Sequence, residues 1–145
     1  MFEVRGFLLA VMLVLAAQAV GADVLTGSDR FLCAPIQAAE CFENGECGID
    51  VPWNLNIPGF IEVDLAAMRL STTAASGENR STPIEHVTRR DGAIVLQGFE
   101  MGRAFSWVIS EDSGHVTAAI ASEGRGVTVF GACTPIASNT ETSHK

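Results

Sequence analysis

Short apolar stretches alternate with turn residues from Phe60 to Cys133, at intervals of about 8 to 12 residues. This interval is typical of strands joined by tight turns, and no long helical period competes with it. We therefore expect a single all-β domain, a small antiparallel meander of about 6 to 8 strands that forms a closed barrel or a sandwich. Pro35 to Phe42 is the one stretch where a helix is the alternative, because it contains good helix formers.

The two clearest hairpins surround residues that favour tight turns. Asp91-Gly92 tolerates the positive φ angles of a type I′ turn, and it lies between Pro83 to Arg90 and Ala93 to Phe99. Phe60 to Asp64 and Arg69 to Thr72 would be the two arms of another hairpin. Each pair of segments predicts two neighbouring antiparallel strands.

The two tryptophans lie in different contexts. Trp107 is in phase with Phe105 and Ile109 on one strand face, so we expect it in the core. Trp53 lies in the irregular segment Val51 to Gly59, which contains two prolines. We expect Trp53 to cover the core, and a surface that faces a partner is the alternative.

The first 22 residues have the organisation of a secretory signal peptide. Arg5 supplies positive charge, Phe7 to Ala17 form an uncharged apolar region, and Val20-Gly21-Ala22 offers small residues for cleavage. The apolar run is shorter than the roughly 20 residues of a membrane-spanning helix, so no stable membrane anchor is expected. We predict cleavage after residue 22, one domain over residues 23–134, a flexible tail over residues 135–145, and a location in the periplasm or outside the cell.

The chain is acidic, with 17 acidic and 9 basic side chains and a formal net charge of −8. Removal of residues 1–22 would leave this charge unchanged, because that segment holds one glutamate and one arginine. An acidic surface repels phosphate backbones, so nucleic acid is not an expected partner. A basic protein would be attracted at long range.

Four cysteines in an exported chain of this size predict two disulfides, and they allow three pairings. Asn44-Gly45 favours a tight turn between Cys41 and Cys47, which would bring these two sulfurs together. Cys33 is then left for Cys133, and that bond would tie the first strand to the last. A metal or redox site is the other interpretation, but the sequence has no Cys-x-x-Cys pair and no histidine near the cysteine cluster.

The sequence contains no motif specific enough to name a reaction. It has no Gly-x-Ser-x-Gly nucleophile elbow, and its three histidines lack the spacing of metal ligands. We therefore assign no catalytic residue, no cofactor and no metal site. Glu62, Asp64 and Glu100 are the carboxylates that could bind a ligand or act as acid and base in a hydrolase.

Six short stretches, spread over nearly the whole expected mature chain, carry a resemblance. They are Leu32-Cys33, the Cys41 to Cys47 loop, Phe60-Ile61-Glu62-Val63-Asp64, Val95-Leu96-Gln97-Gly98, Gly102-Arg103-Ala104-Phe105-Ser106-Trp107 and Val129-Phe130-Gly131-Ala132-Cys133. In these stretches the chain resembles a group of small exported proteobacterial β proteins of unassigned function, which implies export and a compact β fold. It is more loosely similar to periplasmic lysozyme inhibitors, small β-barrels in which an early cysteine is joined to a late one. The chain has no tyrosine and so lacks their usual Ser-Gly-x-x-Tyr loop.

Together these features predict a non-enzymatic binding or interaction module of the cell envelope. A basic protein such as a lysozyme-like enzyme fits the charge, and an interior pocket for a small apolar ligand is the second version of this hypothesis. The expected binding residues are Trp53, Glu62, Asp64 and Glu100. Two alternatives stay open, an envelope hydrolase that uses these carboxylates and a structural accessory of an envelope complex.

Overall fold

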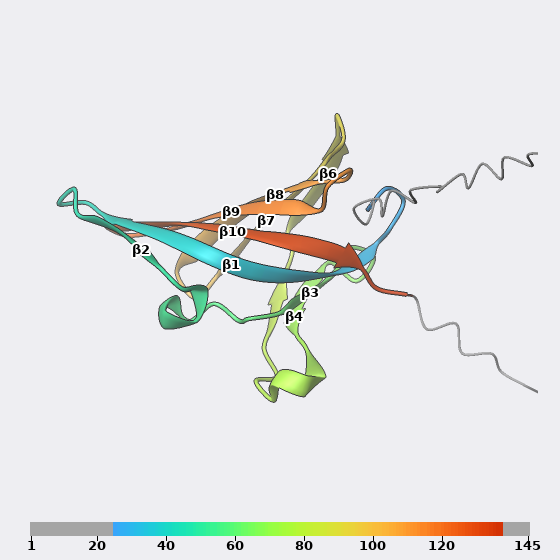
Figure 1. Cartoon of the computed structure of the whole chain (residues 1–145), viewed down its shortest axis with the longest axis horizontal. Helices are drawn as coiled ribbons and strands as arrows, with labels where there is room; N and C mark the ends of the chain where they lie inside the picture. The colour runs from blue at the N-terminus through green and yellow to red at the C-terminus, as the bar shows by residue number, and fades with distance from the viewer. Residues whose placement is uncertain (1–24, 138–145) are drawn as a thin grey trace, which may run out of the picture.

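Ten antiparallel strands form one curled sheet in the computed structural model, which describes residues 25–137 (Figure 1). The strands are β1 (Arg30–Phe42), β2 (Cys47–Asp50), β3 (Ile61–Asp64), β4 (Arg69–Thr72), β5 (Ser81–Pro83), β6 (His86–Arg90), β7 (Ala93–Glu100), β8 (Arg103–Ser110), β9 (His115–Ser122) and β10 (Arg125–Pro135). Two short 3-10 helices lie in the connections, η1 (Pro52–Leu55) and η2 (Ala74–Ser76). The all-β antiparallel class is confirmed. The predicted signal peptide and most of the predicted tail lie outside the described residues.

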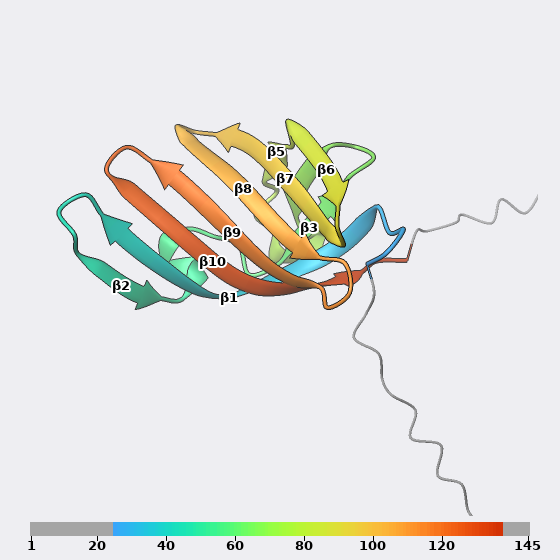
Figure 2. The ribbon, with the colours of Figure 1, turned by 90° about the horizontal axis from the view of Figure 1, so that it is seen from above.

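The sheet is an open half-barrel, seen from above in Figure 2, with the strand order β5-β4-β3-β1-β10-β9-β8-β7-β6. The prediction of six to eight strands in a closed barrel or sandwich was therefore wrong. One expected arm, Pro83 to Arg90, is interrupted at Ile84 and Glu85. Its two parts belong to β5 and β6, which pair with β4 and β7 and so lie at opposite ends of the strand order.

Strand β1 occupies the middle of the sheet. It pairs with β10 on one side, and on the other side its first half pairs with β3 and its second half with β2. Pairing on both sides outweighs the local helix preference of Pro35 to Phe42, so the helical alternative was wrong. The register with β10 shifts between Pro35 and Gln37, where a β-bulge places Ile36 outside the ladder.

Both predicted hairpins are present, the second with β6 alone as its first arm. Strands β3 and β4 pair directly, and β6 and β7 flank a two-residue turn in which Asp91 and Gly92 have φ angles of 52° and 76°. These positive φ values at both central positions are those of a type I′ turn, whose twist matches that of the strands. The turn between β7 and β8 repeats this geometry at Met101 and Gly102, with φ angles of 49° and 78°.

Both predicted disulfides are present. Cys33 and Cys133 are opposite each other on β1 and β10 and are separated by 100 residues along the chain. Cys41 and Cys47 are opposite each other on β1 and β2 and close the hairpin between them. Disulfides persist in oxidising compartments, which supports a location outside the cytosol. Within residues 25–137, no helix is long and apolar enough to cross a membrane.

Apolar side chains fill one end of the concave face, which we call the packed end. Leu25, Phe31 and Ile94 have no exposed surface there. The segment before β1 crosses this end, because the Leu25 amide donates to the Glu111 carbonyl and the Asp29 carbonyl accepts from the Leu65 amide. Residues 25–29 therefore cover this end of the half-barrel.

The two tryptophans differ in burial. Trp107 is only 7% exposed and belongs to the core, as predicted. Trp53 is 63% exposed, so the expectation that it covers the core was wrong. In helix η1 the residue that is buried is Pro52, and Ile57 follows it into the core. The backbone of this segment thus turns Trp53 toward solvent.

Candidate functional site

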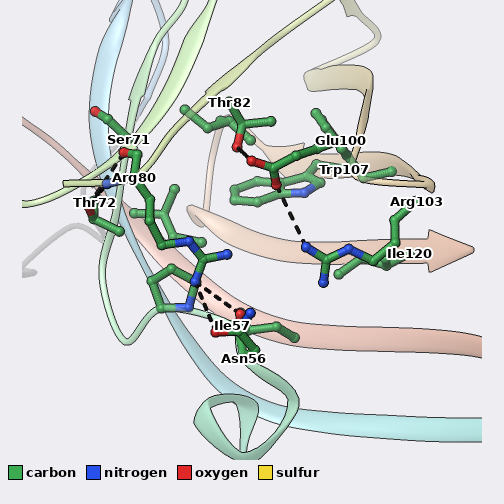
Figure 3. Close-up of a pocket in the computed structure, with 14 residues that line it drawn as sticks. Asn56, Ile57, Ser71, Thr72, Arg80, Thr82, Glu100, Arg103, Trp107 and Ile120 are labelled. Carbon is green, nitrogen blue, oxygen red and sulfur yellow. Dashed lines mark hydrogen bonds and ion pairs between the residues drawn. The ribbon is translucent and has the colours of Figure 1, made fainter. Parts of the chain in front are cut away.

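The other end of the concave face contains a cavity of about 90 Å³, which we call the concave hollow (Figure 3). Its lining comes from β3, β4 and β5 on one side of β1, from β7, β8 and β9 on the other side, and from the segment that follows η1. Its lining residues are Asn56, Ile57, Pro58, Ile61, Leu70, Ser71, Thr72, Arg80, Thr82, Glu100, Arg103, Phe105, Trp107 and Ile120. A smaller hollow of about 30 Å³ adjoins it and shares Ile57, Ile61, Trp107 and Ile120. The two hollows therefore lie next to each other on the concave face.

The floor of the concave hollow is apolar because the inward positions of β8 and β9 carry large side chains. Phe105, Trp107 and Ile120 come from these two strands, and Phe105 is directly opposite Ile120. Phe105 also lies over Gly98 of β7, where an added Cβ would be 2.3 Å from the phenyl ring. The Phe105 ring therefore occupies space that is open because residue 98 has no side chain.

The rim of the hollow carries an ion pair positioned by the β7–β8 turn. Glu100 and Arg103 flank that turn and are partners in the strand register, so both side chains lie on the inward face. The Arg103 Nη2 atom lies 3.8 Å from Glu100 Oε2. The Thr82 hydroxyl donates to Glu100 Oε1 at 2.7 Å, which connects the β7–β8 turn to β5 across the hollow.

Arg80 enters the rim from the opposite side. Its Nη1 atom donates to the Asn56 carbonyl at 3.1 Å and to the Asn56 side-chain oxygen at 3.4 Å. Asn56 adopts the left-handed conformation that ends η1, with φ of 59°. Arg80 therefore fastens the segment after η1 to the connection between β4 and β5.

The structure places the four predicted binding residues in three different regions. Glu100 lines the concave hollow. Glu62 and Asp64 alternate with the buried Ile61 and Val63 on β3, so they are on the outward face, where both pair with Arg30. Trp53 projects from η1 into solvent. Glu62 and Asp64 thus share Arg30 on the outward face, and neither of them lies with Glu100 at the hollow.

Several lining residues were not predicted, Arg80 and Arg103 foremost among them. The signal for Arg103 was present in the sequence, because Arg103 is in phase with Phe105 and Trp107 and must share their inward face. The signal for Arg80 was absent. Its position depends on contacts with Asn56, which lies 24 residues earlier in the chain.

Comparison with known proteins identified no relative. No protein-family model matches the chain, and neither a curated protein nor a solved structure is significantly similar to it. The resemblances noted in the sequence therefore stay predictions. Among residues 25–137, no three histidine, cysteine, aspartate or glutamate side chains are grouped so as to hold a metal ion.

Proposed function

We propose that this chain is an exported binding module that takes an apolar group of a small ligand into the concave hollow. The observation that carries the proposal is the composition of the hollow, an apolar floor around Trp107 beneath a rim of charged and hydroxyl side chains. Small-molecule sites commonly combine a concave apolar surface with a few polar groups that orient the ligand.

The placement of the carboxylates favours binding over hydrolysis. Glycoside hydrolysis of the usual kind requires two carboxyl groups on either side of one bond. Glu100 faces the hollow, whereas Glu62 and Asp64 face outward and are paired with Arg30. The hydrolase hypothesis therefore has less support than the binding hypothesis.

The test is to identify what the protein carries and to block the hollow. Native mass spectrometry of protein purified without reductant from the periplasm should show a small bound mass that denaturation releases. Ile120→Trp would fill the hollow, and Ala119→Trp is its control, because Ala119 is the exposed neighbour on the same strand and faces outward. We expect Ile120→Trp to lose the bound mass and Ala119→Trp to retain it. Equal retention by both variants would contradict the proposal.

A second candidate function is binding of a basic protein at the tip formed by the β1–β2 and β9–β10 turns, which we call the acidic tip. Glu43, Glu46 and Glu123 are exposed there and form no ion pair within residues 25–137. The two turns are joined, because the Glu43 amide donates to the Gly124 carbonyl. Unpaired acidic side chains on a disulfide-closed hairpin fit a basic partner.

Calorimetric titration with a basic lysozyme-like enzyme tests this second function. Glu43→Gln, Glu46→Gln and Glu123→Gln together should weaken binding, and more so at low salt than at high salt. Glu85→Gln with Asp112→Asn is a control that removes exposed acids elsewhere. Equal losses per charge removed in the two variants would assign the effect to net charge and remove the tip from consideration. A role as structural accessory of an envelope complex stays a prediction.

A further inference from the structure

We propose, building on the ligand-binding function above, that the ligand is a small amphipathic anion. Its apolar group would contact Trp107, and its carboxylate or phosphate would lie between Arg80 and Arg103. The charged residues of the lining are these two arginines and Glu100, so the hollow has one more positive than negative side chain. The whole chain has a net charge of −8. The lining is thus less acidic than the protein as a whole, and Glu78 lies against Arg80 from outside the lining.

The two arginines are arranged to act on one group. They come from opposite sides of the hollow, and Figure 3 shows their guanidinium groups pointing toward each other across the opening. A guanidinium group is planar and matches the paired oxygens of a carboxylate or a phosphate. An acidic group placed between them would be contacted from both sides.

Arg103 has donors to spare for a ligand. Its contact with Glu100 is 3.8 Å, which is longer than a hydrogen bond. Within residues 25–137 it donates no hydrogen bond, and its side chain is one quarter exposed. A guanidinium group has five N–H donors, so Arg103 can form a bidentate pair with an incoming acid.

Arg80 is held in place by Asn56 and by Glu78. Its Nη1 atom carries the two hydrogen bonds to Asn56, and the same atom lies 3.6 Å from Glu78 Oε2. These contacts fix the guanidinium group at the rim before any ligand arrives. Preorganisation of this kind reduces the conformational entropy that the side chain loses on binding.

Glu100 is the acidic residue of the lining, and its contacts make it a poor site for a cationic ligand. Its Oε1 atom accepts the Thr82 hydroxyl, and its Oε2 atom faces Arg103. The carboxylate therefore has a hydrogen bond on one oxygen and a positive charge near the other. It would compete with an anionic ligand for Arg103, so its removal should strengthen anion binding.

The experiment uses the fluorescence of Trp107 as the probe of the hollow. The chain has two tryptophans, and Trp53 is exposed, so Trp53→Phe leaves Trp107 as the single fluorophore. This protein is titrated with octanoate, octyl phosphate and octylammonium below their micelle concentrations, and with octan-1-ol below its solubility limit. The four probes share one apolar chain and differ in the head group. The adjoining hollow provides space for the end of that chain.

We expect octanoate or octyl phosphate to bind about tenfold more tightly than octan-1-ol, as charged hydrogen bonds allow. The tighter of the two assigns the head group as carboxylate or phosphate. Arg103→Gln and Arg80→Gln should each remove most of this preference and leave octan-1-ol binding within about twofold. Glu100→Gln should act in the opposite direction and raise the affinity for the anion. Arg69→Gln is the matched control, because Arg69 is an exposed arginine outside the hollow.

Two negative outcomes separate the two proposals. If octan-1-ol binds as tightly as both anions, or if octylammonium binds most tightly, the anionic ligand class is wrong while the binding function stands. If none of the four probes changes Trp107 fluorescence or gives heat in calorimetry, the binding function itself is wrong. Opposite effects of Glu100→Gln and Arg103→Gln on the affinity for the anionic probe would not arise from a general loss of structure.

Discussion

At the packed end of the half-barrel the concave face is filled by Leu25, Phe31 and Ile94, whereas the opposite end leaves a hollow beside Trp107. The same strands β7, β8 and β9 supply both ends. The difference comes from the irregular segments that cross them. Residues 25–29 place Leu25 inside the packed end, and the segment from η1 to Ile57 places Trp53 outside and leaves the hollow open. In this fold, the segments before β1 and after β2 therefore decide which end of the concave face stays open.

The largest expected difference concerns the two disulfides. Replacing Cys33 and Cys133 together by alanine should lower the free energy of unfolding by about 4 to 5 kcal/mol, because that bond closes a long loop. Replacing Cys41 and Cys47 should cost only about 2 kcal/mol, because their separation is 6 residues. Urea unfolding without reductant measures both losses. Equal losses would show that loop length does not govern the stability of this domain.

Truncation of one aromatic ring at each end compares the two ends directly. Phe31→Ala should cost about 3 to 5 kcal/mol, because Phe31 is fully buried and the packed end cannot collapse freely. Phe105→Ala should cost roughly 2 kcal/mol, because its ring already borders open space and loses less buried surface. Urea unfolding of the two variants gives the comparison. A larger loss for Phe105 than for Phe31 would contradict the assignment of packed and hollow ends.

The polar contacts that hold residues 25–29 can be tested with neighbouring arginines. Arg89 pairs with Asp29 and Glu111 and also donates to the Ser28 carbonyl, so Arg89→Gln should cost about 1 kcal/mol. Within residues 25–137 Arg90 pairs only with the adjacent and largely exposed Asp91, so Arg90→Gln should have almost no effect. Hydrogen exchange at the Leu25 amide should rise in the first variant alone. The same rise in both would show that Arg89 does not hold this segment.

The smallest expected effect concerns the turn that carries Glu100 and Arg103. Met101 has a φ of 49°, a conformation that asparagine adopts at lower cost than methionine. Met101→Asn should raise stability by about 0.5 kcal/mol, whereas Met101→Val should lower it, because β-branched residues fit such φ angles poorly. Thermal unfolding measures both changes. A stability loss in the asparagine variant would contradict this account of the turn.

The sequence was sufficient for the local part of the fold. The turn at Asp91-Gly92, the buried face of Trp107 and the Cys41–Cys47 disulfide follow from nearest-neighbour signals, and all are confirmed. The Cys33–Cys133 disulfide is also confirmed, but it was predicted by elimination because its cysteines are 100 residues apart. It was insufficient where pairing partners are far apart. Pro35 to Phe42 is extended because β10 and β2 pair with it, and no signal within that stretch indicates them.

The site was predictable only in part for the same reason. Glu100 was selected as a carboxylate, but its inclusion in the hollow depends on Thr82 and Arg103. Glu62 and Asp64 look equivalent to Glu100 in the sequence, yet strand alternation places them on the outward face with Arg30. The exposure of Trp53 depends on the backbone of η1, which buries Pro52 instead. The phase of each residue on its strand, more than its type, decides which side chains reach the hollow.

The central position of β1 has a consequence for the order of assembly. Strands β6 to β10 are sequential neighbours, so they can pair as soon as each is available, whereas β1 must find β10 at the far end of the chain. Contacts between segments so distant in the sequence form slowly, because loop closure precedes any gain from pairing. A nascent chain that lacks β10 has no partner for one whole side of β1. The two halves of the sheet therefore join late, after β10 has been synthesised. The Cys33–Cys133 disulfide then links β1 to β10 covalently.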